Sequence, residues 1–142
     1  MISKMFMLLA LMFAFSPFNL FAQSVWGPEN HYNKLYDITT VESVTGLVLA
    51  IDKIYPENNL SYGIHLTLNT TEGNVSVHLG PGWFIENQDI QINSNDYVTV
   101  TGSKITVNGV DIIVAKNVMK DDKILVLREE NGYPLWSGWR SR

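Results

Sequence analysis

Apolar and polar residues alternate strictly along two neighbouring segments near the middle of the chain. Ile64–Asn69 and Asn74–Leu79 each carry a large aliphatic residue at every second position, with polar residues between them. Because successive side chains of a strand point to opposite faces, this pattern predicts two half-buried strands. The intervening residues 70–73 favour a turn, so we expect a hairpin with one apolar and one polar face.

Three further elements follow from local patterns. Val41–Tyr55 is rich in β-branched and apolar residues and contains Gly46, and a glycine inside a long strand usually marks a bulge or a sharp bend. Trp83–Gln88 follows a Gly-Pro-Gly break and is predicted to form a turn or two of helix, with Pro81 near its start, where proline is tolerated. Lys123–Arg128 is predicted to be the last strand.

A second hairpin is expected over Tyr97–Val107 and Val110–Met119. An Asn-Gly pair joins them, which is the strongest short hairpin signal and places Val107 opposite Val110. The predicted order is a long bent strand, a hairpin, a short helix and two more strands, which is the order of an OB-fold. We therefore expect an all-β, OB-fold-like small barrel of five to six strands, with one short helix between the third and fourth strands. A β-sandwich is the alternative, but its seven or more strands fit this pattern poorly.

The N-terminal residues have the features of a secretory signal. Lys4 precedes the uncharged apolar run Met5–Phe15, and a Ser-Pro break leads to Ala22, after which we expect cleavage. An uncleaved anchor is the alternative, but the apolar run is too short to span roughly 30 Å of hydrocarbon. The sequence thus predicts a periplasmic or secreted protein with no stable membrane anchor once the signal is removed.

The chain divides into four predicted segments. These are a signal peptide (1–22), an irregular lead-in (23–40), an OB-like barrel domain (41–128) and an aromatic tail (129–142). The chain contains 10 Lys and Arg against 14 Asp and Glu, so it has no electrostatic basis for binding nucleic acid. It contains no cysteine, which excludes disulfides, thiolate metal sites, cysteine catalysis and covalent c-type haem.

The polar face of the first hairpin carries the most informative candidate site. Strand parity places His65 and His78 on this face, together with Thr67 and Ser76. If Asn69 pairs with Asn74 across a four-residue loop, the two histidines are directly opposite, with Cβ atoms roughly 4.5–5.5 Å apart. Thr67 then lies opposite Ser76. The next allowed register would place His78 opposite Thr67 instead.

Two interpretations of the histidines stay open. Two imidazoles at this spacing can bind a transition metal or an anionic ligand, with a third group supplied by His31 or by an acidic loop residue such as Glu86. Alternatively, His65 and His78 are solvated surface residues, or they pack under a terminal segment.

The aromatic tail is the second candidate surface. Tyr133, Trp136 and Trp139 with Arg140 could stack a sugar or a base, or dock on a partner. The alternative is that Trp136 and Trp139 fold back over an open end of the barrel, together with Trp83 and Phe84, because large rings near a chain end usually pack on their own domain.

Several reaction classes have no sequence support. The chain has no Gly-x-Ser-x-Gly element, no His-Glu-x-x-His helix and no phosphate loop. Ser76 lies near both histidines, but a serine on a flat strand lacks an oxyanion hole. The polar face of the hairpin also has no Lys, Arg, Phe, Tyr or Trp, which single-strand nucleic-acid binders need. We therefore expect a non-enzymatic protein without a cofactor.

Several stretches of the sequence resemble a known family. These are the run from His65 through His78-Leu79-Gly80-Pro81-Gly82-Trp83-Phe84, the stretch Val100-Thr101-Gly102-Ser103-Lys104 and the ending Gly132 to Arg140. Together they resemble small exported OB-like proteins similar to the C-terminal domain shared by the magnetosome S and X proteins, and more distantly the periplasmic bacterial OB-fold family. The magnetosome X protein also carries haem-binding Cys-x-x-Cys-His motifs, which this chain lacks.

The sequence thus predicts an exported OB-like binding or accessory module of the cell envelope. Its partner is expected to be an envelope protein or a small ligand. The alternative function is a periplasmic metal-handling protein that uses His65 and His78.

Overall fold

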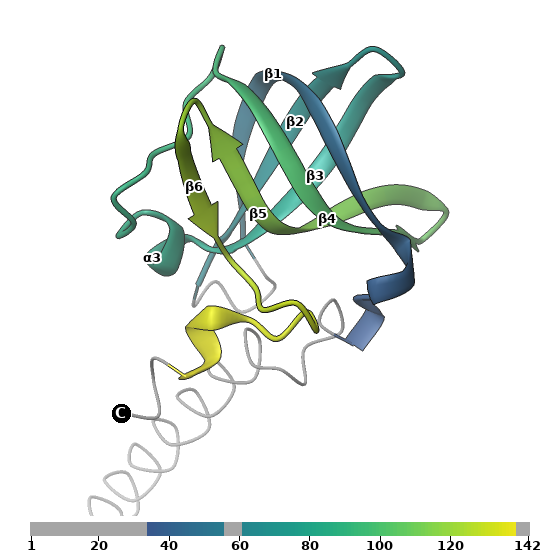
Figure 1. Cartoon of the computed structure of the whole chain (residues 1–142), viewed down its shortest axis with the longest axis vertical. Helices are drawn as coiled ribbons and strands as arrows, with labels where there is room; N and C mark the ends of the chain where they lie inside the picture. The colour runs from purple at the N-terminus through teal and green to yellow at the C-terminus, as the bar shows by residue number, and fades with distance from the viewer. Residues whose placement is uncertain (1–33, 56–60, 139–142) are drawn as a thin grey trace, which may run out of the picture.

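The computed structural model describes residues 34–55 and 61–138, which form a twisted sheet of six strands and a few short helical turns (Figure 1). The strands are β1 (Val41–Ile54), β2 (Gly63–Thr70), β3 (Gly73–Pro81), β4 (Tyr97–Val107), β5 (Val110–Lys120) and β6 (Lys123–Val126). The helical turns are η1 (Ile38–Thr40), α3 (Gly82–Ile85) and η2 (Leu135–Gly138).

The sheet closes on itself. Its strand order is β3-β2-β1-β4-β5-β6, and an additional parallel pairing of β3 with β5 joins the two sides into a ring. The long strand β1 makes this possible because its first half pairs with β4 and its second half with β2. The predicted all-β, barrel-like fold with one short helix between the third and fourth strands is confirmed, and a single sheet of this order is not a two-sheet sandwich.

The glycine in β1 has a different role from the one predicted. The irregular pairing of β1 with β2 lies between Val48 and Ala50, not at Gly46, which pairs regularly with Val98 of β4. A Cβ atom at Gly46 would overlap the backbone carbonyl of Asn69. Gly46 therefore allows the close approach of β1 and β2 at the point where β1 changes partners, and the bulge follows a few residues later.

The other predicted elements are confirmed with small shifts at their ends. The Asn-Gly turn pairs Val107 with Val110, as expected. The helix is shorter than predicted and ends at Ile85, and β6 ends at Val126. The following residues leave the strand because the backbone amides of Leu127 and Arg128 both donate to the carbonyl of Lys116.

The core fills the space inside the ring of strands. Its buried apolar members come from every strand, from α3 and from the C-terminal segment: Val48, Ile64, Leu66, Leu68, Val77, Leu79, Phe84, Ile85, Val98, Val100, Ile113, Ala115, Val118, Leu125, Leu127 and Trp136. Figure 1 shows α3 and the C-terminal segment at the same end of the barrel.

Some predictions fall on residues outside the described ranges. These are the signal peptide 1–22 with its cleavage after Ala22, His31 in the lead-in, and Trp139 and Arg140 in the tail. Within the ranges 34–55 and 61–138, no helix has the length and apolar character needed to cross a membrane.

Candidate functional site

The β2–β3 hairpin has the first of the two registers that the polar pattern allowed. Its cross-strand pairs include His65 with His78, Thr67 with Ser76 and Asn69 with Asn74. The aliphatic residues between them point into the core and are mostly fully buried, whereas these six polar residues share the outer face. We call these six residues the hairpin polar face. The amide of Asn69 donates to the side-chain oxygen of Asn74 at 2.8 Å, which completes a regular ladder of polar pairs.

The two histidines of this face stack on one another. Their ring centroids are 3.5 Å apart and their planes differ by 9°, so the imidazoles lie face to face. Both side chains are half-buried. Directly opposite positions on antiparallel strands have Cβ atoms about 4.5–5.5 Å apart, so backbone pairing alone brings the rings within stacking distance.

Burial makes both histidines weak bases. Desolvation lowers the pKa of His65 to about 4, although the nearby carboxylate of Asp52 opposes this shift. Desolvation also lowers the pKa of His78 to about 3, and its proximity to His65 lowers it further, because two adjacent imidazoles cannot easily both carry charge. Both rings are therefore neutral at pH 7, and each retains an in-plane nitrogen lone pair.

The stacked arrangement does not by itself form a chelate. Imidazole lone pairs lie in the ring plane, and in two nearly parallel planes 3.5 Å apart they run side by side instead of converging on one point. Of the third ligands considered from sequence, His31 lies outside the described residues. Glu86 is engaged elsewhere, because it accepts from the hydroxyl of Tyr62 at 2.6 Å and lies 3.9 Å from the ammonium of Lys53. No group of three or more His, Cys, Asp or Glu among the described residues is placed to hold a metal ion.

Sequence reasoning missed the neighbours of the histidines on the adjoining strands. Asp52 of β1 pairs with His65, and Val114 of β5 pairs with His78. Val114 in turn pairs with Ser103 of β4, and both are completely buried on the outer side of the sheet. Ser103 accepts a hydrogen bond from the backbone amide of Asp37 at 3.0 Å. The lead-in thus covers the β4 side of this row, while Asp52 at the other side is exposed.

The tail residue Trp136 lies in the core. It is only 2% exposed, and its ring packs against Phe84 of α3 with centroids 5.6 Å apart. Gly80 lies beneath the ring at φ +150°, and a Cβ atom there would be 2.8 Å from the indole. The structure places Trp136 as the folded-back interpretation of the tail describes, with Phe84 as its partner.

A buried arginine lies between the tail and the lead-in, and sequence reasoning did not single it out. Arg128 is 5% exposed, and its guanidinium carbon lies 5.0 Å from the ring centroid of Trp136 and 5.6 Å from that of Tyr36. It donates to the carbonyl of Gly132 at 3.0 Å. Desolvation lowers its pKa to about 10, with Tyr36 opposing, so the arginine stays charged and holds the tail by cation–π contacts.

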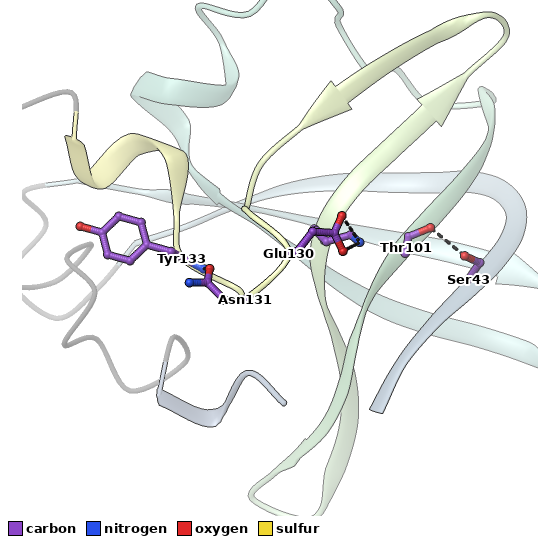
Figure 2. A network of polar contacts seen from close by, with 6 residues as sticks. Ser43, Thr101, Glu130, Asn131 and Tyr133 are labelled. Carbon is purple, nitrogen blue, oxygen red and sulfur yellow. Dashed lines mark hydrogen bonds and ion pairs between the residues drawn. The ribbon is translucent and has the colours of Figure 1, made fainter. Parts of the chain in front are cut away.

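Another part of the outer surface carries polar pairs without histidines. Figure 2 shows Ser43 of β1 facing Thr101 of β4, with their hydroxyls 2.7 Å apart. The hydroxyls of Thr45 and Thr99 on the same two strands lie 2.9 Å apart. Tyr133, which Figure 2 also shows, is 43% exposed in the tail. The Thr45–Thr99 pair has the same chemistry as the hydroxyl pair of the hairpin polar face but lies on other strands. Tyr133 is a tail aromatic like Trp136 but is more exposed. Both therefore provide control positions for mutagenesis.

The most distinctive stretch of the sequence, residues 78–84, acts mainly in the architecture. Its first residue is one of the stacked histidines, Leu79 is in the core, and Gly80 accommodates Trp136. Pro81 occupies the position just before α3 without a side-chain capping hydrogen bond, and α3 carries Phe84 to the same tryptophan. This segment therefore connects the hairpin polar face to the packing of the tail.

Comparison with known protein families identifies one match. A family model described as the MamS/MamX magnetosome protein family matches residues 40–125, which run from the end of η1 into β6. No curated protein sequence matches the chain. The resemblance to the magnetosome S and X proteins drawn from residues 65–140 is confirmed over most of the barrel.

Proposed function

The chain belongs to the MamS/MamX magnetosome protein family, and from this premise we propose that it is a magnetosome-associated accessory protein that binds a partner and does not transform a substrate. The family supports an accessory role. The observation that carries the binding role is the hairpin polar face, a regular row of polar cross-strand pairs whose opposite side is buried in the core.

The binding surface is the outer face of β2 and β3. Strands of small barrels commonly present such a face to ligands, because alternating side chains separate core contacts from outer contacts. The pairs Thr67–Ser76 and Asn69–Asn74 offer hydroxyl and amide groups in fixed positions. This chemistry suits a protein segment or a small polar ligand, and it lacks the cationic groups and large aromatic platforms that nucleic acids need.

The protein acts outside the cytoplasm in this proposal. The support comes from the sequence, in which Lys4, the apolar run Met5–Phe15 and Ala22 have the features of a secretory signal.

Non-catalytic binding fits the geometry of the face. Ser76 and His78 lie two positions apart on one strand, and His78 stacks on His65. A stacked, desolvated imidazole is a weak base, so it is poorly suited to accept a proton from a serine hydroxyl at neutral pH.

A comparison of two matched variants tests the binding face. The full chain is immobilised and exposed to an envelope extract of the producing cells, and captured proteins and small molecules are identified by mass spectrometry. Thr67→Glu with Ser76→Glu should abolish capture of a specific partner, whereas the control, Thr45→Glu with Thr99→Glu, should retain it. Both pairs are cross-strand pairs of small hydroxyl residues. Equal capture by the two variants would contradict the assignment of the binding face.

Metal handling by His65 and His78 is the second candidate function. The observation that favours it is the direct contact of two neutral imidazoles on one face of the sheet. Neutral imidazole is the form that binds transition metals, and no proton has to be displaced at pH 7.

A further inference from the structure

A carboxylate and two imidazoles lie in one row across three adjacent strands. Asp52 of β1 pairs with His65 of β2, and His65 pairs with His78 of β3. Paired residues on neighbouring strands project to the same side of a sheet, so all three side chains lie on the outer face. The row is not evident in the sequence because its three residues lie on three different strands.

We propose that His65 and His78 bind one divalent transition metal ion of the Cu²⁺ or Zn²⁺ class, and that Asp52 orients His65 for this purpose. This inference rests on the second candidate function and specifies its ligands, its metal class and its positioning residue. It does not depend on the capture of an envelope partner.

The backbone spacing allows the two imidazoles to reach a common ion. The Cβ atoms of directly opposite residues are roughly 4.5–5.5 Å apart, and metal–imidazole bonds are about 2.0–2.1 Å long. In the structure the rings are stacked, so their lone pairs are parallel. Rotation of the rings about their side-chain bonds turns the lone pairs toward one point without moving the strands. Metal binding in this way therefore requires the two stacked rings to rotate away from one another.

The donor set selects the class of metal. Imidazole nitrogen suits Cu²⁺, Zn²⁺ and Ni²⁺, and Cu²⁺ binds most strongly to a given nitrogen site among the first-row divalent ions. Mg²⁺ and Ca²⁺ prefer oxygen ligands and should not compete. The proposed site uses two protein ligands, and the described residues hold no cluster of three.

Asp52 acts as a positioning residue. It is exposed, and as the cross-strand partner of His65 it lies on the same face of the sheet as that imidazole. Metal-bound histidines commonly donate their second N–H to a carboxylate, which sets the tautomer and the ring orientation, and loss of that partner typically costs 10–100-fold in metal affinity. On the other side of His78, the row continues with the buried Val114 of β5.

The test is calorimetric titration of the full chain, purified without a histidine tag, with Cu²⁺ and with Zn²⁺ at pH 7. We expect one bound ion per chain. His65→Ala and His78→Ala should each abolish binding, and Asp52→Asn should weaken it by about 10-fold or more. Asp52→Glu should restore most of the affinity, and Asp122→Asn, at an exposed turn, should leave it unchanged. Proton NMR with Zn²⁺ should show the histidine ring signals losing the upfield shift caused by stacking.

The outcomes separate the parts of the proposal. If the wild-type chain binds neither ion, the metal site is refuted, while the envelope-capture experiment still decides the accessory function. If the chain binds metal but Asp52→Asn has the wild-type affinity, the role of Asp52 is refuted. If His31→Ala abolishes binding, the site is not the two-histidine site described here.

Discussion

Replacement of the tail tryptophan tests whether residues 129–138 are part of the folded domain. Trp136→Ala removes a side chain that is 2% exposed and that contacts Phe84 and Arg128. The barrel end beneath it then opens around Gly80. We expect a large loss of stability, because the mutation both creates a cavity and removes one of the two aromatic rings that the buried Arg128 guanidinium contacts within residues 34–55 and 61–138.

The magnitude follows from burial. A buried aromatic side chain removes about 150–250 Å² from water, which corresponds to about 4–6 kcal/mol as an upper estimate. Large-to-small aromatic substitutions in cores cost about 3–5 kcal/mol. The cation–π contact with Arg128 adds up to about 2 kcal/mol when it is desolvated. A loss of about 4 kcal/mol is therefore expected, which is a large part of a typical total stability of about 5–15 kcal/mol.

Urea denaturation of the full chain, followed by circular dichroism, measures this loss. The matched control is Tyr133→Ala, which removes a tail aromatic that is 43% exposed and should cost less than about 1 kcal/mol. Trp139→Ala, combined with Trp136→Ala, tests whether the second tail tryptophan adds to the same effect.

A second perturbation reaches the same contact from the opposite side. Gly80→Ala places a Cβ atom 2.8 Å from the Trp136 ring and also strains a residue at φ +150°. The steric part of its cost should disappear when Trp136 is already alanine, so the two mutations should be non-additive by about 1 kcal/mol or more. An unchanged denaturation midpoint for Trp136→Ala would refute the structural role of the tail, and strict additivity would refute the contact with Gly80.

Three further predictions concern other parts of the molecule. Burial lowers the pKa of His65 from 6.5 to about 4 and that of His78 from 6.5 to about 3. Between each lowered pKa and 6.5, the unfolded chain therefore binds more protons than the folded chain. The contribution of the two histidines to stability is therefore complete above pH 6.5 and falls as the pH drops toward 4. At pH 5 the total loss is about 2 kcal/mol after allowing for the partial exposure of the rings. Urea midpoints at pH 7.5 and 5 should show this loss, and replacing both histidines with Phe should remove it. N-terminal sequencing of exported protein should begin at or near Gln23, and recovery of only the intact chain from the cytoplasm would contradict export. Gly46→Ala should cost about 3 kcal/mol or more, because its Cβ would overlap the carbonyl of Asn69, and a wild-type midpoint would show that β1 and β2 can separate there at little cost.

The sequence alone determined which residues share a face. In a strand the side-chain period is two, so the alternation in residues 64–79 placed His65 and His78 on the outer face whatever the rest of the fold. It also restricted the register of the hairpin to pairings that keep the aliphatic residues together, and the observed pairing is one of these. The Asn-Gly turn determined the second hairpin in the same local way. These properties depend on neighbours within a few residues, which is why the pattern sufficed.

Only the tertiary structure decided what surrounds those residues. Asp52 comes next to His65 because β1 changes partners from β4 to β2, and Val114 comes next to His78 because β3 pairs with β5 to close the ring. Stacking and desolvation of the imidazoles, the burial of Trp136 and the position of Arg128 in its contact with Tyr36 all arise from such long-range pairings. A pattern with period two indicates which side of a strand is apolar, but it carries no information about which distant strand lies beside it. The amount of water removed from each side chain, and with it the pKa of each histidine, therefore depends on how the sheet closes.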